Sequence, residues 1–387
     1  MSDELKPDWD PGSEASLRDQ RMTYDRMRET CPVAYSERLG WSVFRHEDVS
    51  RVLLEHETFS SSVSTHCAVP NGMDPPQHTV YRRIIEPYFA PERMAAFEPV
   101  CRDIVATLVR DTLEGDETEL IADFALPFAV RVQCAFLGWP AALHDPLIRW
   151  TVNSHDAVLA HDRPAISALA REFEGFIDGE LETRRQSGAK PEDDVTTALM
   201  HERVEGRPFN REEIASILRN WTAGEVGTIS AAVGILVHYL AEHAGLQRQL
   251  RDDPSLLPAA IDEILRIHGP LVANRRVTSC PVEIGGRVLD AGERISINWV
   301  SANRDGRVFD EPDTFRLDRD PSANLLYGLG IHVCPGAPLA RLELQIVMEA
   351  LLGHTTSIAL APDKLPTNAV YPASGFSTLP LRIVRAS

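Results

Sequence analysis

The first ten residues lack the basic stretch and apolar core of a secretory signal, since they hold a single lysine among polar and acidic side chains. No segment reaches the roughly 18 uninterrupted apolar residues that a membrane-spanning helix needs. The nearest candidate, residues 121–140, is interrupted by Asp123 and Arg131. We therefore predict a cytoplasmic protein without a membrane anchor.

Lysine is also scarce although arginine is plentiful, and 57 acidic side chains outweigh 39 Lys and Arg to give a net charge of -18 at pH 7. A phosphate backbone demands basic surface, so this balance argues against a nucleic-acid partner. The six cysteines are spread through 387 residues, whereas disulfide frameworks belong to short secreted domains. We expect most of these cysteines to be buried small hydrophobic side chains.

The chain shows no internal repeat, low-complexity tract or Gly/Ser linker. Its hydrophobic content of 43% is enough to bury a substantial core. We therefore predict one domain over residues 1–387, of which residues 1 to about 20 form an N-terminal extension.

Apolar residues recur at helical spacing over 90–135, 142–186 and 210–266. Asn210, with an acidic residue three positions later, predicts a capping box at the start of a helix that runs to Gly245. After residue 270, short strands are predicted over 282–284, 288–289 and 295–297, and a terminal sheet over 357–360 and 379–384. This order indicates a mainly α fold with a small β part.

The helix predicted from residue 210 contains Gly224 and Gly227 in its interior, where each glycine costs roughly 1 kcal/mol relative to alanine. Close packing of a neighbouring helix is one explanation. The other is that a flat, bulky ligand lies against the helix there.

The most informative stretch is residues 327–336, which read Tyr-Gly-Leu-Gly-Ile-His-Val-Cys-Pro-Gly and precede an apolar-periodic run. Such a loop places the sulfur of Cys334 at a helix N-terminus, where free N–H groups and the helix dipole stabilise a thiolate. Glycines in the loop let the backbone approach a large flat ligand. A thiolate held in this way suits haem iron, to which it donates electron density.

This aromatic-x-x-Gly-x-His-x-Cys-x-Gly pattern resembles the haem-binding loop of the cytochrome P-450 family. Other segments resemble, in order, the family's haem-contacting helix, its Glu-x-x-Arg pair, the segment before the loop and the helix after it: 74–83, 263–266, 301–319 and 339–343. The resemblance extends from about residue 20 to the end of the chain. It implies the single-domain cytochrome P-450 fold and heme b as cofactor.

The resemblance implies that Cys334 is the axial ligand of the haem iron. It also implies that four basic side chains hold the haem propionates: His78, Arg82, Arg275 and His332. Guanidinium groups suit this task because they pair with carboxylates in a bidentate manner. Three further residues would form a buried ion-paired cluster behind the haem: Glu263, Arg266 and Arg319. Considered alone, Glu263 and Arg266 equally fit an exposed helical pair.

The sequence departs from the family pattern at two positions near the haem. The family commonly has an acid directly before the oxygen-binding threonine, whereas Gly227 precedes Thr228 here. We predict that Thr228 hydrogen-bonds the bound oxygen and that Glu225, or water beside Gly227, relays protons; a purely structural Glu225 is the alternative. Pro335 has no N–H to offer the sulfur, which predicts a more electron-rich thiolate.

The resemblance implies a monooxygenase that activates dioxygen to hydroxylate or dealkylate a small hydrophobic or aromatic substrate. Electrons are expected from a separate ferredoxin and ferredoxin reductase, which would dock near Arg83 and Arg341. By analogy, four mostly apolar segments line the substrate pocket: residues 61–73, 221–226, 271–273 and 374–376.

Other readings of the same residues stay open. A peroxygenase that uses hydrogen peroxide, or an oxidase that couples or cyclises its substrate without oxygen insertion, keeps the haem and changes the reaction. A non-catalytic haem sensor keeps the haem without a reaction. A zinc site that includes His332 and Cys334 would replace the haem, although no second ligand pair at suitable spacing is evident.

Overall fold

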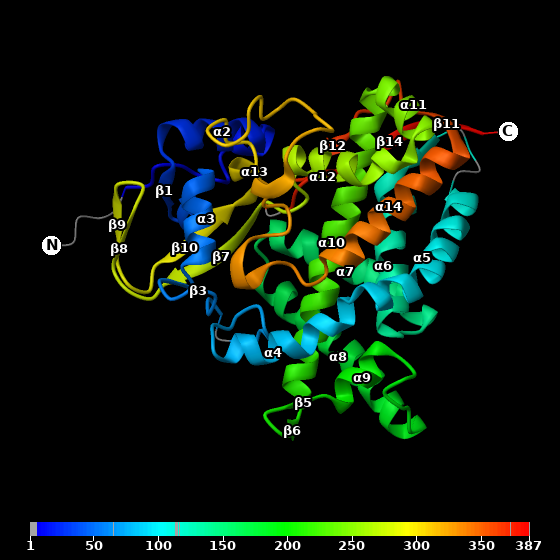
Figure 1. The fold of residues 1–387 in the computed structure, drawn as a ribbon, viewed down its shortest axis with the longest axis horizontal. Coiled ribbons are helices and arrows are strands. Elements are labelled where there is room, and N and C mark those ends of the chain that lie inside the picture. Colours follow the sequence, from blue (N-terminus) through cyan, green and yellow to red (C-terminus); the bar gives the residue numbers. More distant parts are fainter. Residues whose placement is uncertain (1–5, 65, 113–114, 116, 372, 387) are drawn as a thin grey trace.

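The computed structural model describes residues 6–64, 66–112, 115, 117–371 and 373–386. Helices make up most of the fold (Figure 1). The α-helices are α1 (Glu14–Arg18), α2 (Gln20–Thr30), α3 (His46–Leu54), α4 (Gln77–Ile85), α5 (Pro91–Thr112), α6 (Leu126–Leu137), α7 (His144–Leu159), α8 (Arg163–Ser187), α9 (Val195–His201), α10 (Arg211–Glu242), α11 (Ala244–Asp252), α12 (Leu257–His268), α13 (Trp299–Ala302) and α14 (Ala337–His354). The mainly α fold predicted from the sequence is confirmed.

Short strands form a five-stranded sheet in the order β1-β2-β10-β7-β3, a three-stranded sheet in the order β11-β14-β4, and three hairpins, β5-β6, β8-β9 and β12-β13. Their bounds are β1 (Val33–Ser36), β2 (Gly40–Val43), β3 (Phe59–Ser60), β4 (Glu117–Glu119), β5 (Arg203–Val204), β6 (Arg207–Pro208), β7 (Ala273–Thr278), β8 (Val282–Ile284), β9 (Arg287–Leu289), β10 (Arg294–Asn298), β11 (Thr355–Leu360), β12 (Thr367–Asn368), β13 (Phe376–Thr378) and β14 (Pro380–Arg385). The strands predicted after residue 270 are confirmed, and Ile358 pairs with Ile383 in the terminal sheet.

The long helix α10 begins as the sequence predicts, because the Asn210 side chain and Glu213 complete a capping box. Its end differs from the prediction. The helix stops at Glu242, where His243 leaves helical geometry, and Gly245 lies inside the next helix, α11. The ring of His243 accounts for the earlier stop, since its Nδ1 lies 2.6 Å from the Tyr239 carbonyl oxygen.

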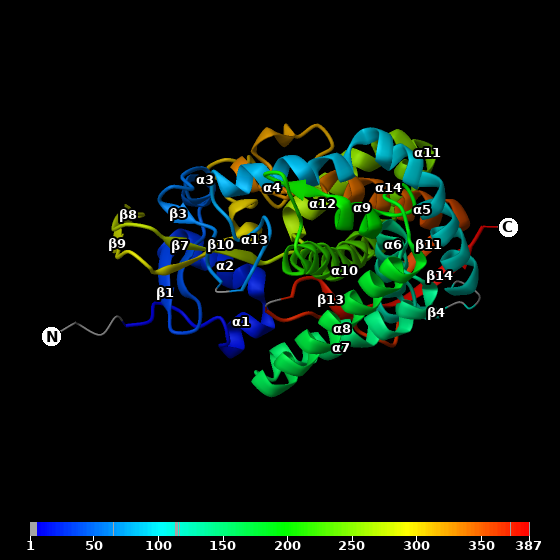
Figure 2. The ribbon, with the colours of Figure 1, turned by 90° about the horizontal axis from the view of Figure 1, so that it is seen from below.

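Helix α10 crosses the middle of the molecule and packs against α6, α12 and α14 (Figure 2). Within the described residues it is the one helix that is long and apolar enough to cross a membrane. Most of its side chains are buried against other parts of the protein, as expected for the central helix of a core.

The region predicted as helix over 90–135 is interrupted. After α5 the chain forms β4 and one π-helical turn, Ile121–Ala125, before α6 begins. β4, which lies between α5 and α6, pairs with β14 and so connects the C-terminal sheet to these helices. The predicted N-terminal extension includes α1, and Trp9 packs edge-on against Phe44; residues 1–5 of that extension lie outside the described residues.

Candidate active site

Cys334 lies three residues before the first residue of α14, Ala337. The Cys334 N–H donates to the Tyr327 carbonyl oxygen at 2.8 Å, which closes the loop back onto its own start. Gly330 has φ +72°, and a Cβ there would lie 2.9 Å from the Leu53 carbonyl oxygen, so this loop can rest on α3 only with glycine. The loop therefore fixes where the sulfur sits.

The Cys334 side chain is accessible although the residues around it are closely packed. Burial raises the pKa of the thiol, while the backbone N–H groups of Gly336 and Ala337 donate toward the sulfur and oppose that shift. These two N–H groups belong to the start of α14, as the loop pattern predicts. Pro335, between them and the cysteine, contributes none.

The middle of α10 has an open face. Ala223, Gly224 and Gly227 are exposed although the helix crosses the interior, and a Cβ on either glycine would meet no atom within 4 Å. At 100° per residue these positions share one side of the helix, which we call the open face. Thr228 lies at its margin and is partly buried. Close helix packing does not explain these two glycines, whereas a flat ligand does.

Three of the four segments predicted to line a substrate pocket converge on α10. In the segment over residues 61–73, the Val69 N–H donates to Ser216 Oγ at 2.8 Å, and its carbonyl oxygen accepts from Asn220 at 3.2 Å. Leu271 and Ala373 form an isolated β-bridge, which brings the segment at 271–273 next to the residue directly before the segment at 374–376. Gly375 packs on α10 at Ile235.

The fourth segment, over residues 221–226, lies elsewhere in part. Trp221 packs edge-on against Phe89 at 5.1 Å and near Phe136 at 6.1 Å, inside an aromatic cluster between α10 and α6. Val226 is buried on another side of the helix. Only Ala223 and Gly224 of this segment belong to the open face, and the pocket role of Trp221 stays a prediction.

The rings of His78 and His332 are in contact, with centroids 4.3 Å apart and planes tilted by 59°, although the two residues lie far apart in the sequence. The Nε2 atom of His332 lies 2.9 Å from Ser61 Oγ, whereas the Nε2 atom of His78 is buried without a partner in the described residues. Burial lowers the pKa of both histidines, that of His332 to about 3, so both rings are neutral near pH 7. His78 thus offers a buried polar nitrogen with no protein group to satisfy it.

Arg276 is the buried guanidinium beside these histidines. It is 7% exposed, and its positive charge contributes to the low pKa of His332. Arg275, the residue predicted for this role, is exposed because successive side chains of β7 point to opposite faces of the sheet. The structure therefore places Arg276, which sequence reasoning missed by one position, in the group with His78 and His332.

Arg82 lies one helical turn after His78 on α4. Its Nε donates to Glu86 at 2.8 Å, and its Nη2 donates to the Val333 carbonyl oxygen at 2.5 Å. The guanidinium thus touches the residue that precedes Cys334. This position links α4 directly to the cysteine loop.

Glu263, Arg266 and Arg319 form the cluster that the resemblance implies. Arg266 donates to both carboxylate oxygens of Glu263, at 2.7 and 2.9 Å, and Arg319 donates to the same carboxylate at 2.8 Å. Arg266 is only 1% exposed and also donates to the Asn303 carbonyl oxygen at 2.7 Å. The cluster is therefore a buried ion pair and not an exposed helical one.

Glu225 lies on the side of α10 next to that of Thr228. Its carboxylate is turned toward α6 and α14, where it contacts Gln133 and Glu343. Burial raises the pKa of Glu225 to about 7. Thr228, three residues later, separates this carboxylate from the open face.

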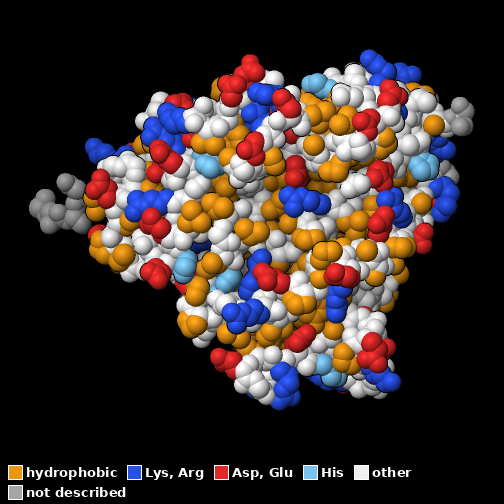
Figure 3. Space-filling view, in the orientation of Figure 1, with side chains coloured by type: hydrophobic (Ala, Val, Ile, Leu, Met, Phe, Trp, Pro, Cys, Tyr) orange, Lys and Arg blue, Asp and Glu red, His pale blue; other side chains and the backbone are white. Residues whose placement is uncertain are grey.

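The side of the molecule that carries α4 and the start of α14 bears mixed charge (Figure 3). Arg83 and Arg341 are both exposed, as the proposed docking role requires. Arg341 is partly engaged, because it donates to Asp262 at 3.1 Å and lies 4.3 Å from the ring centroid of Tyr327. The hydroxyl of Tyr327 is buried with no partner in the described residues.

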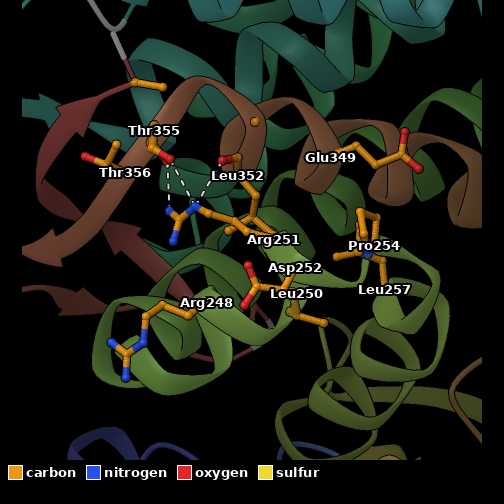
Figure 4. Close-up of a pocket in the computed structure, with 12 residues that line it drawn as sticks. Arg248, Leu250, Arg251, Asp252, Pro254, Leu257, Glu349, Leu352, Thr355 and Thr356 are labelled. Atoms are coloured by element: carbon orange, nitrogen blue, oxygen red, sulfur yellow. Dashed lines mark hydrogen bonds between the residues drawn. The ribbon is translucent and has the colours of Figure 1, made fainter.

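Two further cavities lie away from Cys334. The one in Figure 4, of about 560 Å³, lies between α11 and the end of α14, where Arg251 donates to the carbonyl oxygens of Leu352 and Thr355. Those bonds give its guanidinium a structural role. The other, of about 530 Å³, borders the predicted substrate segments at Val272 and Phe376.

These residues fit a haem group. The accessible sulfur with two N–H donors suits an iron ligand, the glycines of the open face leave room for a flat ring, and the unsatisfied His78 nitrogen beside Arg276 suits a propionate. A zinc site gains no support, since the described residues hold no cluster of three or more His, Cys, Asp or Glu side chains suited to a metal ion.

Comparison with known proteins agrees with a haem-binding site. The cytochrome P-450 family model matches residues 139–364. The chain is 32% identical over 342 residues to the erythromycin C-12 hydroxylase of Saccharopolyspora erythraea, covering 85% of each protein. It is 32% identical over 357 residues to the mycinamicin IV hydroxylase/epoxidase of Micromonospora griseorubida, covering 87% of this chain and 88% of that protein.

A solved structure of a cytochrome P-450 from Bacillus megaterium in complex with testosterone matches with a TM-score of 0.83 and 27% identity, covering 97% of this chain and 99% of that one. The family match spans more than half of the chain and includes the long helix with its open face and the loop that holds Cys334. By its sequence, its fold and the surroundings of that cysteine, the chain belongs to the cytochrome P-450 family of haem-iron oxidoreductases.

Proposed function

We propose that this chain is a single haem domain over residues 1–387 that binds heme b through Cys334 and hydroxylates or dealkylates a small hydrophobic or aromatic substrate. The observation that carries the proposal is an accessible cysteine at the start of α14 together with a glycine-lined open face on α10. Heme b, when bound, supplies the site at which dioxygen is reduced. One oxygen atom enters the substrate and the other leaves as water, with two electrons and two protons consumed.

The haem propionates are bound by His78, His332 and Arg276, with Arg276 in place of Arg275. His78 supplies its free Nε2 nitrogen, and Arg276 supplies positive charge that no carboxylate of the described residues neutralises within salt-bridge distance. Arg82 joins this group by turning from the Val333 carbonyl, a movement that needs only side-chain rotation.

Thr228 hydrogen-bonds the oxygen from the margin of the open face, and the protons pass through Glu225 or through water beside Gly227. Thr228 lies between Glu225 and the open face, and this position supports a proton route from Glu225 past Thr228 to the oxygen. Because Gly227 carries no side chain, water or a substrate group occupies the space that a larger residue would fill.

The substrate contacts the segments at 61–73, 271–273 and 374–376, which meet around α10. Leu271 is 39% exposed and bridges to Ala373, so its apolar side chain is available for contact there. The similar proteins named above include an erythromycin C-12 hydroxylase, a mycinamicin IV hydroxylase/epoxidase and one structure with bound testosterone. The apolar side chains of the segment at 271–273 favour an apolar substrate.

Electrons come from a ferredoxin and its reductase, which dock on the side of Cys334. Arg83 and Arg341 provide exposed positive charge there, which attracts an acidic partner. A non-catalytic sensor would have no need of this route.

The first experiment is the difference spectrum of the reduced protein with carbon monoxide, recorded beside Cys334→His. A strongly red-shifted Soret band that the substitution abolishes is expected for a thiolate ligand. A histidine-type spectrum that does not change with the substitution contradicts the proposal. Turnover with ferredoxin and reductase, compared with turnover on hydrogen peroxide alone, then separates a monooxygenase from a peroxygenase.

A further inference from the structure

The cavity of about 530 Å³ that borders the substrate segments lies between α2, the C-terminal half of α10, the end of α12 and the β12-β13 hairpin. Figure 2 shows β13 beside α10. Cys334 and the residues of the open face are not among the described residues that line this space, which we call the α2–α10 cavity. Its size suits a small-molecule site. The polar and aromatic residues that line it include Arg21, Tyr24, His238, Tyr239, His268 and Phe376.

Aromatic rings form one wall of the α2–α10 cavity. His238 on α10 stacks on Phe376 of β13, with centroids 4.3 Å apart and planes tilted by 27°. Tyr239, the next residue of α10, meets His268 edge-on with centroids 5.5 Å apart. These four residues, which we call the aromatic wall, offer contact area for a flat apolar ring.

Arg21 on α2 adds a positive charge that the protein neutralises incompletely. Its one ion pair among the described residues is with Asp313 at 3.9 Å, and Asp313 lies closer to Arg304, at 2.6 Å. The Nη1 atom of Arg21 donates to Nδ1 of His268 at 2.8 Å. His268 is neutral near pH 7, because burial and the charges of Arg21 and Arg304 lower its pKa to about 3. Burial and Arg304 also lower the pKa of Arg21, to about 10, so an added anion would stabilise its charged form.

The other charged side chains of the cavity are already engaged or exposed. Arg18 pairs with Glu14 at 2.8 Å on the surface of α1. Asp19 caps α2, where its carboxylate accepts a backbone N–H at 2.9 Å. The side chain of Glu242 is 51% exposed, so solvent screens its charge. Arg21 is therefore the group that gains most from an anionic ligand.

We propose that the α2–α10 cavity is an effector site that binds a small aromatic carboxylate and thereby tightens the binding of substrate. The carboxylate of the ligand pairs with Arg21, and its ring lies against the aromatic wall. The effect on substrate rests on the proposed function, because it needs a substrate beside the haem group.

The segments at 271–273 and 374–376 border both sites. Val272 lines the α2–α10 cavity, whereas Leu271 points to the other side, since successive side chains of an extended chain alternate. The β-bridge at Leu271 ties the two segments together. A ligand that fills the space behind them restricts their movement, so a substrate on the other side loses less free energy in ordering them.

Isothermal titration calorimetry of the purified haem protein with naphthaleneacetate tests the site. A second series contains saturating phenylimidazole, whose nitrogen ligates haem iron and whose ring lies on the substrate side. We expect one naphthaleneacetate per chain in both series. Naphthaleneacetamide, which has the same ring and no charge, should bind about tenfold more weakly, because it forms no charge-assisted hydrogen bonds with Arg21.

Arg21→Gln should weaken naphthaleneacetate binding about tenfold for the same reason. Arg18→Gln is the matched control, since Arg18 lines the same cavity and already pairs with Glu14; it should bind like the unmodified protein. Circular dichroism checks that both variants are folded. The comparison of naphthaleneacetate with its amide needs no variant.

Spectral titration with phenylimidazole measures the coupling between the two sites. Naphthaleneacetate should lower the Kd of phenylimidazole about fivefold, and Arg21→Gln should remove this effect. The inference is overturned by three results: equal binding of acid and amide, binding of naphthaleneacetate that phenylimidazole abolishes, or an unchanged Kd of phenylimidazole. Loss of the thiolate–haem signature with carbon monoxide marks a failure of the proposed function instead, and calorimetry with naphthaleneacetate alone still tests the cavity.

Discussion

Removal of the Glu263 carboxylate tests how strongly the buried cluster supports the fold. That carboxylate accepts from Arg266 at 2.7 and 2.9 Å and from Arg319 at 2.8 Å, and Arg266 is 1% exposed. Glu263→Ala would leave a guanidinium charge buried without a counter-charge, which typically costs about 3–5 kcal/mol. We expect a loss near 3 kcal/mol, because Arg266 keeps its bonds to the carbonyl oxygens of Asn303 and Pro312.

A loss of this size is a large share of the 5–15 kcal/mol that typically holds a protein folded. Urea unfolding measures it, followed by far-ultraviolet circular dichroism and by haem absorbance. The matched control is Asp262→Asn, on the same helix. Asp262 pairs with Arg341 at 3.1 Å, with side chains 24% and 53% exposed, so its loss should cost at most about 1 kcal/mol. Equal stability of the two variants would refute the reasoning, because it would mean that the Arg266 charge is solvated.

Three further outcomes are expected. Burial raises the pKa of Asp48 to about 6, so the folded protein holds this proton more tightly than the unfolded chain and loses stability as pH rises from about 4 through 6. Asp48→Asn should remove up to about 3 kcal/mol of that loss, and an unchanged difference in urea stability between pH 5 and pH 8 would contradict this. Gly227→Val should weaken substrate binding about tenfold, seen as a reduced spectral response, without loss of stability. Gly234→Ala is the matched control: its Cβ would lie 2.7 Å from Cδ1 at the movable end of the Ile121 side chain, so it should change the free energy of unfolding by less than about 1 kcal/mol and leave substrate binding unchanged. Pro335→Leu adds an N–H beside the sulfur and should raise the haem potential in potentiometry; no upward shift would count against the electron-rich thiolate.

Local chemistry explains what the sequence predicts correctly. The glycine-rich loop and the helix after it are adjacent in the sequence to Cys334, so the sequence predicts the backbone groups around its sulfur. The capping box at Asn210 likewise predicts the start of α10. The Glu-x-x-Arg cluster also follows from a motif within one helical turn. The predicted end of α10 is too late because the prediction takes glycine as the signal that ends a helix. The helix ends instead at His243, which is not a glycine, so the prediction runs on to Gly245.

Features that depend on packing between distant segments are not predicted. Two consecutive arginines on β7 point to opposite faces, and one sequence does not show which of Arg275 and Arg276 is buried. The contact of Glu225 with Glu343 depends on how α10 crosses α14. One hint was present, because Glu343 interrupts the buried apolar positions of its helix.

The five-stranded sheet has a consequence for how the chain is made. β2 is among the first strands to leave the ribosome, yet Val43 pairs in parallel with Ile297 of β10. Until β10 has been synthesised, one edge of the β1-β2 hairpin has no partner and can pair with another nascent chain. We therefore expect that slow translation between residues 60 and 290 favours aggregation, and that a chaperone bound to the N-terminal hairpin during this interval favours recovery of the soluble haem protein.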